Sequence, residues 1–333
     1  MFTHSNLPHN EYINWGKGYQ NPRKNPNVIE MFANLIKLIS ALPLKSLHRL
    51  GWVLGWIMYL SSPTYAKRLR DNISESGLVS NKPDLKKLIK NNIIESGKAL
   101  TEAPHIWFSS RDDCAKLMKK VYGWDLVEEG LKRKQGLILL TPHIGCFEII
   151  PHYLSMQFPF TALYRPPKLK FLTPLLKFGR QRENIRLATT DVSGVRTLLK
   201  ALKRGEAIGV LPDQVPGSGD GEWADFFGRP AYTMTMWSRL AERSGATVLL
   251  MATNRLSNSD GFELFFHNLP NQAEGESASR QLNKALEFLI KKNPSQFLWS
   301  YNRYKKPSIK HFKKNLPTAT KHDENISDDN LND

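Results

Sequence analysis

The sequence predicts an α/β fold in which helices flank a mainly parallel central sheet, preceded by a helical segment of different character. After residue 136, short apolar runs alternate with amphipathic helical patterns. This alternation is typical of parallel sheets whose strands are joined by crossover helices. The chain has 333 residues, 41% hydrophobic and 10% aromatic, which is enough for one large or two ordinary domains. These figures exclude a globally disordered or fibrous chain.

We expect four segments along the chain. Residues 1–27 form a polar arm, rich in Asn and Pro, without the apolar run of a secretory signal. Residues 28–60 form a membrane-associated helical segment, and residues 61–316 form an α/β domain with a helical lead-in. Residues 317–333 are polar and acidic, and this composition predicts a disordered tail.

The segment 28–60 holds two apolar blocks separated by a basic turn that contains Pro43. A membrane-spanning helix needs about 20 consecutive apolar residues, and neither block is a convincing span. The first block has one broad apolar face, as helices at a membrane interface do, and Trp52, Trp56 and Tyr59 in the second suit the headgroup depth. We therefore expect membrane contact, monotopic or as a tilted single span. The alternative is a pair of amphipathic helices that covers the domain's own core.

The next segment has helical periodicity from Pro83 to Leu131 and then changes to alternating strands and helices. The expected strands are Leu137–Leu140, Thr161–Tyr164, Ile185–Ala188, Ala207–Leu211, Thr247–Ala252 and Phe262–Phe266. The expected helices are Phe171–Arg182, Gly194–Lys203, Met234–Arg243 and Ser277–Lys292. Ligands of such sheets usually bind at the carboxyl ends of the strands, so the loops that leave the strands are where chemistry is expected.

His143 lies in the loop that leaves the first of these strands, and Glu148 follows five residues later. On one continuous helix their side chains would point about 140° apart, so a direct pair needs His143 in the turn and Glu148 early in the next helix. Gly145 gives the backbone the freedom for that turn. A histidine held by a carboxylate is a general base. The alternative is a hydrogen-bonded loop histidine and an unrelated surface carboxylate.

Two further loops carry ionisable residues at the same edge of the sheet. Arg165 comes just after the second strand, and Asp213 comes just after the fourth. An arginine there can bind a phosphate or carboxylate through two hydrogen bonds, and Asp213 could hold that arginine in place. The alternative is a structural Arg–Asp pair without a ligand.

Five motifs together resemble the late acyltransferases of lipid A biosynthesis, the lauroyl and myristoyl transferases of the lysophospholipid acyltransferase superfamily. They are H-x4-E (His143, Glu148), Y-R-P (Tyr164 to Pro166), L-P-D-Q (Leu211 to Gln214), F-F-G-x-P-A-x-T (Phe226 to Thr233) and W-x-x-x-R-x-K (Trp299 to Lys305). The resemblance covers roughly residues 28–306. The first motif is shared across the superfamily, whereas its combination with D-Q and F-F-G-x-P-A is more specific. The stretch between His143 and Glu148 often reads F-G-N-W in the family and here reads Ile-Gly-Cys-Phe, which leaves the acyl chain and the acceptor position open.

The resemblance implies a glycerolphosphate-acyltransferase-like fold and an O-acyltransferase. Such an enzyme moves a fatty acyl group from acyl carrier protein to a hydroxyacyl chain of a Kdo-bearing lipid A precursor. His143 would deprotonate the acceptor hydroxyl and Glu148 would orient His143, without a covalent enzyme intermediate, a cofactor or a metal.

The resemblance also implies a set of substrate-binding residues: Arg165, Asp213, Gln214, Phe226, Phe227, Gly228 and Thr233. Within this set, Arg165 would bind a phosphate or the developing oxyanion, supported by Asp213. The two phenylalanines, Gly228 and Thr233 would line an acyl-chain tunnel, although core packing explains the phenylalanines equally well.

The charge of the chain fits anionic partners. Lys and Arg number 47 and Asp and Glu 31, a net charge of +16, and without the acidic residues 317–333 the remainder carries +20. Such an excess favours association with an acidic carrier protein, a phosphorylated lipid acceptor or an anionic leaflet. The resemblance implies the bacterial inner membrane, with the catalytic domain on its cytoplasmic face, because acyl carrier protein is cytosolic. The only two cysteines, Cys114 and Cys146, fit a reducing compartment.

Three other functions explain parts of the sequence. Cys146, three residues from His143, could be the nucleophile of a thiol acyltransferase. A nucleic-acid-binding protein would explain the positive charge, but that charge is dispersed and no zinc-finger or RNP-like motif accompanies it, so we expect no nucleic-acid partner. The main alternative is a related membrane acyltransferase whose acceptor is a glycolipid, an ornithine-type aminolipid or a lysophospholipid, because its acid–base step would be the same.

Overall fold

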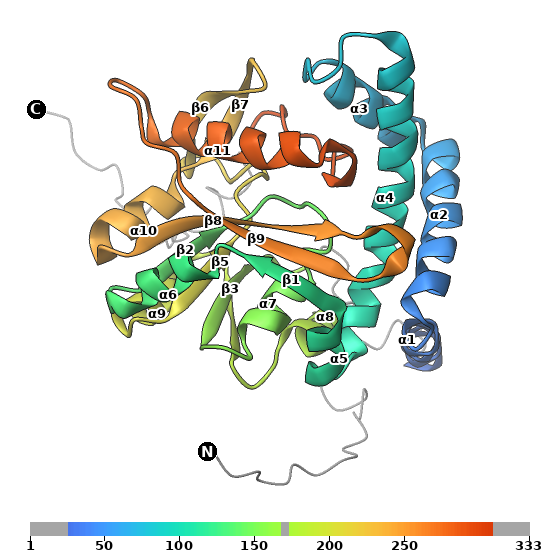
Figure 1. Ribbon diagram of the computed structural model, residues 1–333, viewed down its shortest axis with the longest axis horizontal. Helices are drawn as coiled ribbons and strands as arrows, with labels where there is room; N and C mark the ends of the chain where they lie inside the picture. Colours follow the sequence, from blue (N-terminus) through green and yellow to red (C-terminus); the bar gives the residue numbers. More distant parts are fainter. Residues whose placement is uncertain (1–25, 168–172, 309–333) are drawn as a thin grey trace, which may run out of the picture.

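The computed structural model describes residues 26–167 and 173–308. Its centre is a seven-stranded sheet in the order β1-β9-β8-β2-β5-β3-β4, with helices packed on both faces (Figure 1). Neighbouring strands are parallel except for the antiparallel pair β8–β9. The predicted α/β fold with a mainly parallel sheet is therefore confirmed. The expectations for residues 1–25 and for the acidic tail lie outside the described residues.

The elements follow one another with short connections. The strands are β1 (Met118–Tyr122), β2 (Leu137–Leu140), β3 (Phe160–Tyr164), β4 (Ile185–Thr189), β5 (Ala207–Val210), β6 (Gly221–Phe226), β7 (Arg229–Met234), β8 (Thr247–Arg255) and β9 (Phe262–Asn268). The α-helices are α1 (Pro26–Ser40), α2 (Leu44–Ser61), α3 (Pro63–Ser74), α4 (Lys82–Phe108), α5 (Arg111–Leu117), α6 (Trp124–Lys132), α7 (Ile149–Leu154), α8 (Thr173–Arg180), α9 (Val192–Lys203), α10 (Met236–Ser244) and α11 (Ala278–Lys292). Each strand and helix expected after residue 136 is present, with ends that differ by a few residues.

The four residues of β2 show how the sheet divides the core. All four are fully buried, as a strand in the middle of a parallel sheet should be. Ile138 and Leu140 belong to the cluster that includes side chains of α9, α10 and α11. Leu137 and Leu139 belong to the cluster on the other face, with side chains of α5, α6 and α7. Alternation along the strand therefore supplies both halves of the core.

The helical lead-in contains one strand that the sequence pattern does not indicate. Residues Met118–Tyr122 form β1, an edge strand that pairs in parallel with β9. Only Met118 of its five residues is fully buried. Its pattern therefore lacks the apolar run of a central strand, and only pairing with β9 makes it extended.

The F-F-G motif forms the turn of a hairpin beside the main sheet. Strands β6 and β7 pair antiparallel up to Phe226 and Arg229, leaving a two-residue turn. Phe227 has φ +48° and Gly228 has φ +71°, and a two-residue turn with both central residues at positive φ matches the twist of its strands. Gly228, predicted to bind substrate, thus has a conformational role in this turn.

The N-terminal helices pack against the long helix α4, as Figure 1 shows. The contact between α2 and α4 is close because Gly97 of α4 faces Gly51 and Gly55 of α2. A Cβ atom on Gly97 would lie 1.9 Å from the carbonyl oxygen of Gly51, so the packing requires glycine there. Leucine, isoleucine, valine, methionine and tryptophan side chains of α1, α2 and the turn between them remain exposed: Met31, Leu35, Leu38, Leu42, Trp52, Val53, Ile57 and Leu60.

None of the helices in the described ranges is long and apolar enough to cross a membrane.

Candidate active site

His143 and Asp213 form the central contact of the site. Nδ1 of His143 lies 2.7 Å from Oδ1 of Asp213, and Oδ2 of Asp213 accepts a hydrogen bond from the main-chain N–H of His143 at 3.0 Å. The Asp213 side chain is buried, whereas the His143 side chain is 16% exposed, so a substrate can reach the ring. One carboxylate thus fixes both the ring and the backbone of the histidine.

The sheet order explains this contact. Strands β2 and β5 are parallel neighbours, and Leu140 is in register with Val210. His143 and Asp213 each lie three residues beyond this pair, in the loops that leave the two strands. The carboxyl ends of parallel strands meet at one edge of a sheet, so these two loops are adjacent.

The contacts of His143 define its protonation. Because Asp213 accepts at Nδ1, the neutral ring carries its proton there and keeps a lone pair on Nε2. Nε2 of Gln214 lies 3.3 Å from Nε2 of His143, on the side where the lone pair points.

Burial raises the pKa of Asp213, but the charge of His143, the hydrogen bonds from His143 and the charge of Arg303 outweigh it and hold this pKa below its ordinary value. Asp213 is therefore ionised at neutral pH.

The loop that carries His143 is fixed on two sides. Gly145 has φ +59°, and a Cβ atom there would lie 2.2 Å from the carbonyl oxygen of Thr253 at the end of β8. On the other side, the N–H of Gly145 donates to the carbonyl of Gln296 at 3.2 Å, and the N–H of Leu298 donates to the carbonyl of His143 at 3.0 Å. The position of His143 thus depends on β8 and on residues 296–298.

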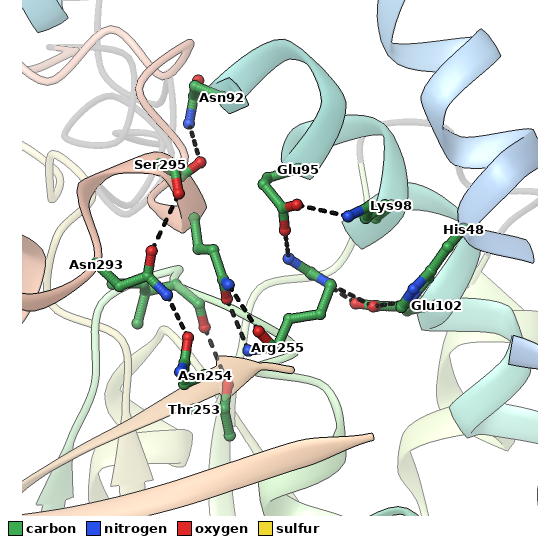
Figure 2. Close-up of polar contacts among 12 residues, drawn as sticks. His48, Asn92, Glu95, Lys98, Glu102, Thr253, Asn254, Arg255, Asn293 and Ser295 are labelled. Carbon is green, nitrogen blue, oxygen red and sulfur yellow. Dashed lines mark hydrogen bonds and ion pairs between the residues drawn. The ribbon is translucent and has the colours of Figure 1, made fainter. Parts of the chain in front are cut away.

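A buried ion cluster fixes the end of β8 itself (Figure 2). The guanidinium of Arg255 donates to Glu102 at 2.5 and 2.6 Å and to Glu95 at 2.5 Å. Nε2 of His48 lies 2.6 Å from Glu102. The side chain of Gln296 bonds the main-chain N–H and carbonyl of Arg255 at 2.8 and 3.0 Å. The cluster ties α2 and α4 to the strand that supports the His143 loop.

Glu148 has partners other than the one expected. Its carboxylate accepts hydrogen bonds from Nε1 of Trp107 at 2.9 Å and from Nε of Arg180 at 3.0 Å, and Nη2 of Arg180 also bonds it. The structure therefore corrects the expected pairing, and His143 is held by Asp213 in place of Glu148. The physical reason is that the chain turns through Gly145, against β8, before Glu148 begins α7.

The ion pair of Glu148 and Arg180 is partly shielded from water. The guanidinium lies over the rings of Trp107 and Tyr164, 5.8 and 5.9 Å from their centroids. Burial raises the pKa of Glu148, but the charge and hydrogen bonds of Arg180, with the hydrogen bond from Trp107, outweigh it and hold this pKa below its ordinary value. The Arg180 side chain is 30% exposed, so it can meet an anionic group while Glu148 holds it.

Arg165 is exposed just beyond β3. No hydrogen bond or ion pair joins Arg165 to Asp213 among the described residues, where both carboxylate oxygens of Asp213 bind His143. Arg165 is therefore available to an anionic group at the surface, without the support that was expected from Asp213.

The remaining predicted binding residues have contacts typical of core packing. Phe226 and Phe227 are buried, their ring centroids are 4.8 Å apart, and Phe227 also packs on Trp299 at 5.5 Å. Thr233 is buried, and its hydroxyl accepts a hydrogen bond from Arg303 at 2.7 Å. These contacts favour the core-packing interpretation of the two phenylalanines over an acyl-chain tunnel.

Arg180 and Trp107 are partners of Glu148 that the sequence analysis does not identify. Arg180 lies in a predicted helix, where its charge looks like that of any solvated basic residue. Trp107 lies in the last turn of α4, far from the motifs along the chain. One available signal is Glu148 itself, because a buried carboxylate needs a cationic partner.

Comparisons with known proteins identify relatives of the chain. A family model described as bacterial lipid A biosynthesis acyltransferase matches residues 26–306. The chain is 26% identical over 274 residues to the lipid A biosynthesis lauroyltransferase of Escherichia coli (strain K12), covering 80% of this chain and 88% of that protein. It is 28% identical over 225 residues to the lipid A biosynthesis palmitoleoyltransferase of the same strain, covering 66% and 72%. The crystal structure of the 1-acyl-sn-glycerophosphate (LPA) acyltransferase PlsC from Thermotoga maritima matches with a TM-score of 0.32 and 14% identity, over 79% of this chain and 95% of that one.

Proposed function

The chain belongs to the bacterial lipid A biosynthesis acyltransferase family and is an acyltransferase of lipid A, and from this premise we propose its donor, acceptor and mechanism. The donor is acyl carrier protein charged with a fatty acyl group. The acceptor is a hydroxyl on a hydroxyacyl chain of a Kdo-bearing lipid A precursor.

The observation that carries the mechanism is the contact of His143 with Asp213. Asp213 holds the proton on Nδ1 and stabilises the imidazolium that forms when Nε2 accepts the proton of the acceptor hydroxyl. The hydroxyl oxygen then attacks the thioester carbonyl, an ester bond forms and the carbon–sulfur bond breaks. The leaving thiolate takes the proton from Nε2, so His143 returns to its neutral form and no covalent enzyme intermediate is needed.

Glu148 acts in this mechanism through Arg180. Its carboxylate orients the partly exposed guanidinium, which binds an anionic group of the acceptor or stabilises the developing oxyanion. Arg165, exposed at the end of the neighbouring strand β3, is a second cation for a phosphate of the acceptor.

The exposed apolar residues of α1 and α2 support a monotopic contact with the bacterial inner membrane, on its cytoplasmic face. The excess of positive charge supports the same location, since the leaflet, the acceptor and the carrier protein are all anionic.

The burial of Cys146 argues against the thiol acyltransferase. Cys146 is 3% exposed, and burial raises the pKa of its thiol well above the ordinary value. A nucleophilic thiolate requires the opposite, an accessible sulfur with a lowered pKa.

The test is transfer of radiolabelled acyl groups from acyl carrier protein to a panel of purified acceptors. We expect transfer to a Kdo-bearing lipid A precursor and loss of transfer in His143→Ala. Transfer to a lysophospholipid, a glycolipid or an aminolipid, with none to the precursor, would refute the proposed acceptor. Turnover near that of the unmodified enzyme in His143→Ala would refute the proposed base.

A further inference from the structure

Arg303 is a buried cation that contacts no carboxylate among the residues that the structure describes. It is 3% exposed, and its guanidinium donates to the carbonyl of Tyr232 at 2.7 Å, to the hydroxyl of Thr233 at 2.7 Å and to Oδ1 of Asn283 at 3.2 Å. All three acceptors are neutral. Nε of Arg303 is buried and has no hydrogen-bond partner among the described residues. Arginine keeps its charge in proteins, so this position holds a full positive charge inside the fold.

The carboxylate that shares a cavity with Arg303 is Asp213. Both residues line a cavity of about 10 Å³ between the L-P-D-Q loop and residues 297–304. A cavity of this volume is just large enough to hold one water molecule. Asn72, whose amide donates to the carbonyls of Trp299 and Tyr301, lines the same cavity.

The other ionisable groups near Arg303 do not balance its charge. Tyr301 and Tyr304 face it, and burial raises the pKa of the Tyr304 hydroxyl to about 12, so Tyr304 is neutral at ordinary pH. Glu287 accepts hydrogen bonds from the main-chain N–H of Phe227 and from Arg280, which offset its charge. Asp213 is then the carboxylate left to compensate Arg303.

We propose that Arg303 is a positioning residue for the catalytic base, acting across this cavity on Asp213. Its charge adds to the contacts of His143 in favouring the ionised carboxylate, and an internal water that accepts from Nε of Arg303 and donates to Asp213 links the two groups. Arg303 thus acts on Asp213, and Asp213 in turn acts on His143. This inference rests on the proposed role of His143, but it concerns the proton affinity of that residue, which is measurable without turnover.

The direction of the effect follows from the sign of the charge. Loss of a positive charge near Asp213 and His143 strengthens proton binding by both groups. The fraction of His143 that is neutral in acidic solution then falls. In Arg303→Gln we expect the acid limb of kcat/KM to move upward by about one pH unit, with roughly tenfold lower activity below the limb and recovery above it. Arg303→Lys, which keeps the charge, should leave the limb in place.

Asn283→Ala is a matched control. It removes a hydrogen-bond partner of Arg303 and keeps the charge. We expect a lower melting temperature in this variant and an acid limb at the position of the unmodified enzyme. A limb that moves in Asn283→Ala as far as in Arg303→Gln would reduce Arg303 to a structural residue and overturn the proposal.

The deciding measurement is the titration of His143 by NMR in protein labelled with ¹³C at histidine Cε1, with the signal assigned by its loss in His143→Ala. We expect His143 to bind its proton more tightly in Arg303→Gln, and a smaller change when the substitution is made in Asp213→Asn, where only the direct effect of the Arg303 charge on His143 remains. An unchanged His143 pKa in Arg303→Gln overturns the inference, whereas turnover in His143→Ala overturns the proposed function instead. If Arg303→Gln does not fold, Arg303→Lys decides, because a His143 pKa displaced despite the retained charge also overturns the inference.

Discussion

Asp213 binds His143 at two points, with one carboxylate oxygen on the ring nitrogen Nδ1 and the other on the main-chain N–H. This arrangement sets the tautomer of the ring and the position of the loop with a single side chain. Asp213 is therefore as important to the proposed base as Glu148 was expected to be. Asp213 contacts His143 directly, whereas Glu148 contacts Arg180 and Trp107.

The first prediction concerns Asp213→Asn, which keeps the shape and removes the charge. An amide can present its N–H₂ to Nδ1 and so favour the wrong tautomer, with the proton on Nε2. We expect kcat to fall by about 10³-fold or more, as for other histidine bases that lose their carboxylate. The measurement is single-turnover acyl transfer. A loss of less than about tenfold would show that Asp213 does not hold the active tautomer.

The sequence predicted the sheet because its central strands are continuous apolar runs. The edge strand β1 and the hairpin β6–β7 carry no such signal. Their extended conformation depends on pairing with β9 and on a turn with two residues at positive φ. The pairing of β1 with β9 joins segments distant in the sequence, and the hairpin turn places Phe227 at a positive φ that bulky residues rarely adopt.

Sequence patterns indicated individual residues of the candidate site but not which of them are in contact. His143 and Asp213 were both singled out from the sequence, since each follows a recognisable strand. Their partnership was not found, because it requires knowing that β2 and β5 are neighbours with Leu140 beside Val210. Local spacing instead favoured Glu148, which the turn at Gly145 directs to Arg180.

The second prediction concerns Cys146, which lies within the His143 loop. We expect Cys146→Ala to keep acyl transfer within about threefold, because the buried thiol contributes packing and its raised pKa excludes a thiolate at neutral pH. Iodoacetamide should modify the folded enzyme slowly, since burial also raises the pKa of Cys114, to about 11. Loss of activity in Cys146→Ala with an unchanged melting temperature would contradict the hydroxyl-attack mechanism.

The third prediction concerns the stability provided by the Arg255 cluster. Burial raises the pKa of Glu102, but the charge and hydrogen bonds of Arg255 and the contact with His48 outweigh it, and the pKa is about 2. A carboxyl whose pKa is depressed on folding adds stability above its unfolded pKa, and this is lost as pH falls through the folded pKa. We therefore expect the free energy of unfolding to fall as pH decreases from about 5 toward 2, and less so in Glu102→Gln.

Removal of the cation tests the same cluster at neutral pH. Arg255→Met removes the guanidinium that compensates Glu102 in the interior, and we expect the free energy of unfolding in urea to fall by about 3–5 kcal/mol. The matched control is Lys67→Met, which breaks the pair of Lys67 with Asp71, whose side chains are 73% and 40% exposed. That change should cost less than about 1 kcal/mol. Equal losses of unfolding free energy in the two variants would show that the cluster contributes no more to stability than an exposed ion pair does.

The last prediction concerns the apolar surface of α1 and α2. Leu38 and Leu60 are 71% and 74% exposed, and insertion of one leucine into a lipid interface contributes about 1.5–3 kcal/mol. We expect Leu38→Asp and Leu60→Asp each to weaken binding to anionic vesicles by roughly tenfold or more in a cosedimentation assay, with the melting temperature unchanged. Asn34→Asp adds the same charge at an exposed position of α1 without removing an apolar side chain, and it should reduce binding by less than about threefold. If Asn34→Asp weakens binding as much as Leu38→Asp, charge alone holds the protein on the vesicle, and raising the salt concentration should then abolish binding completely instead of partially.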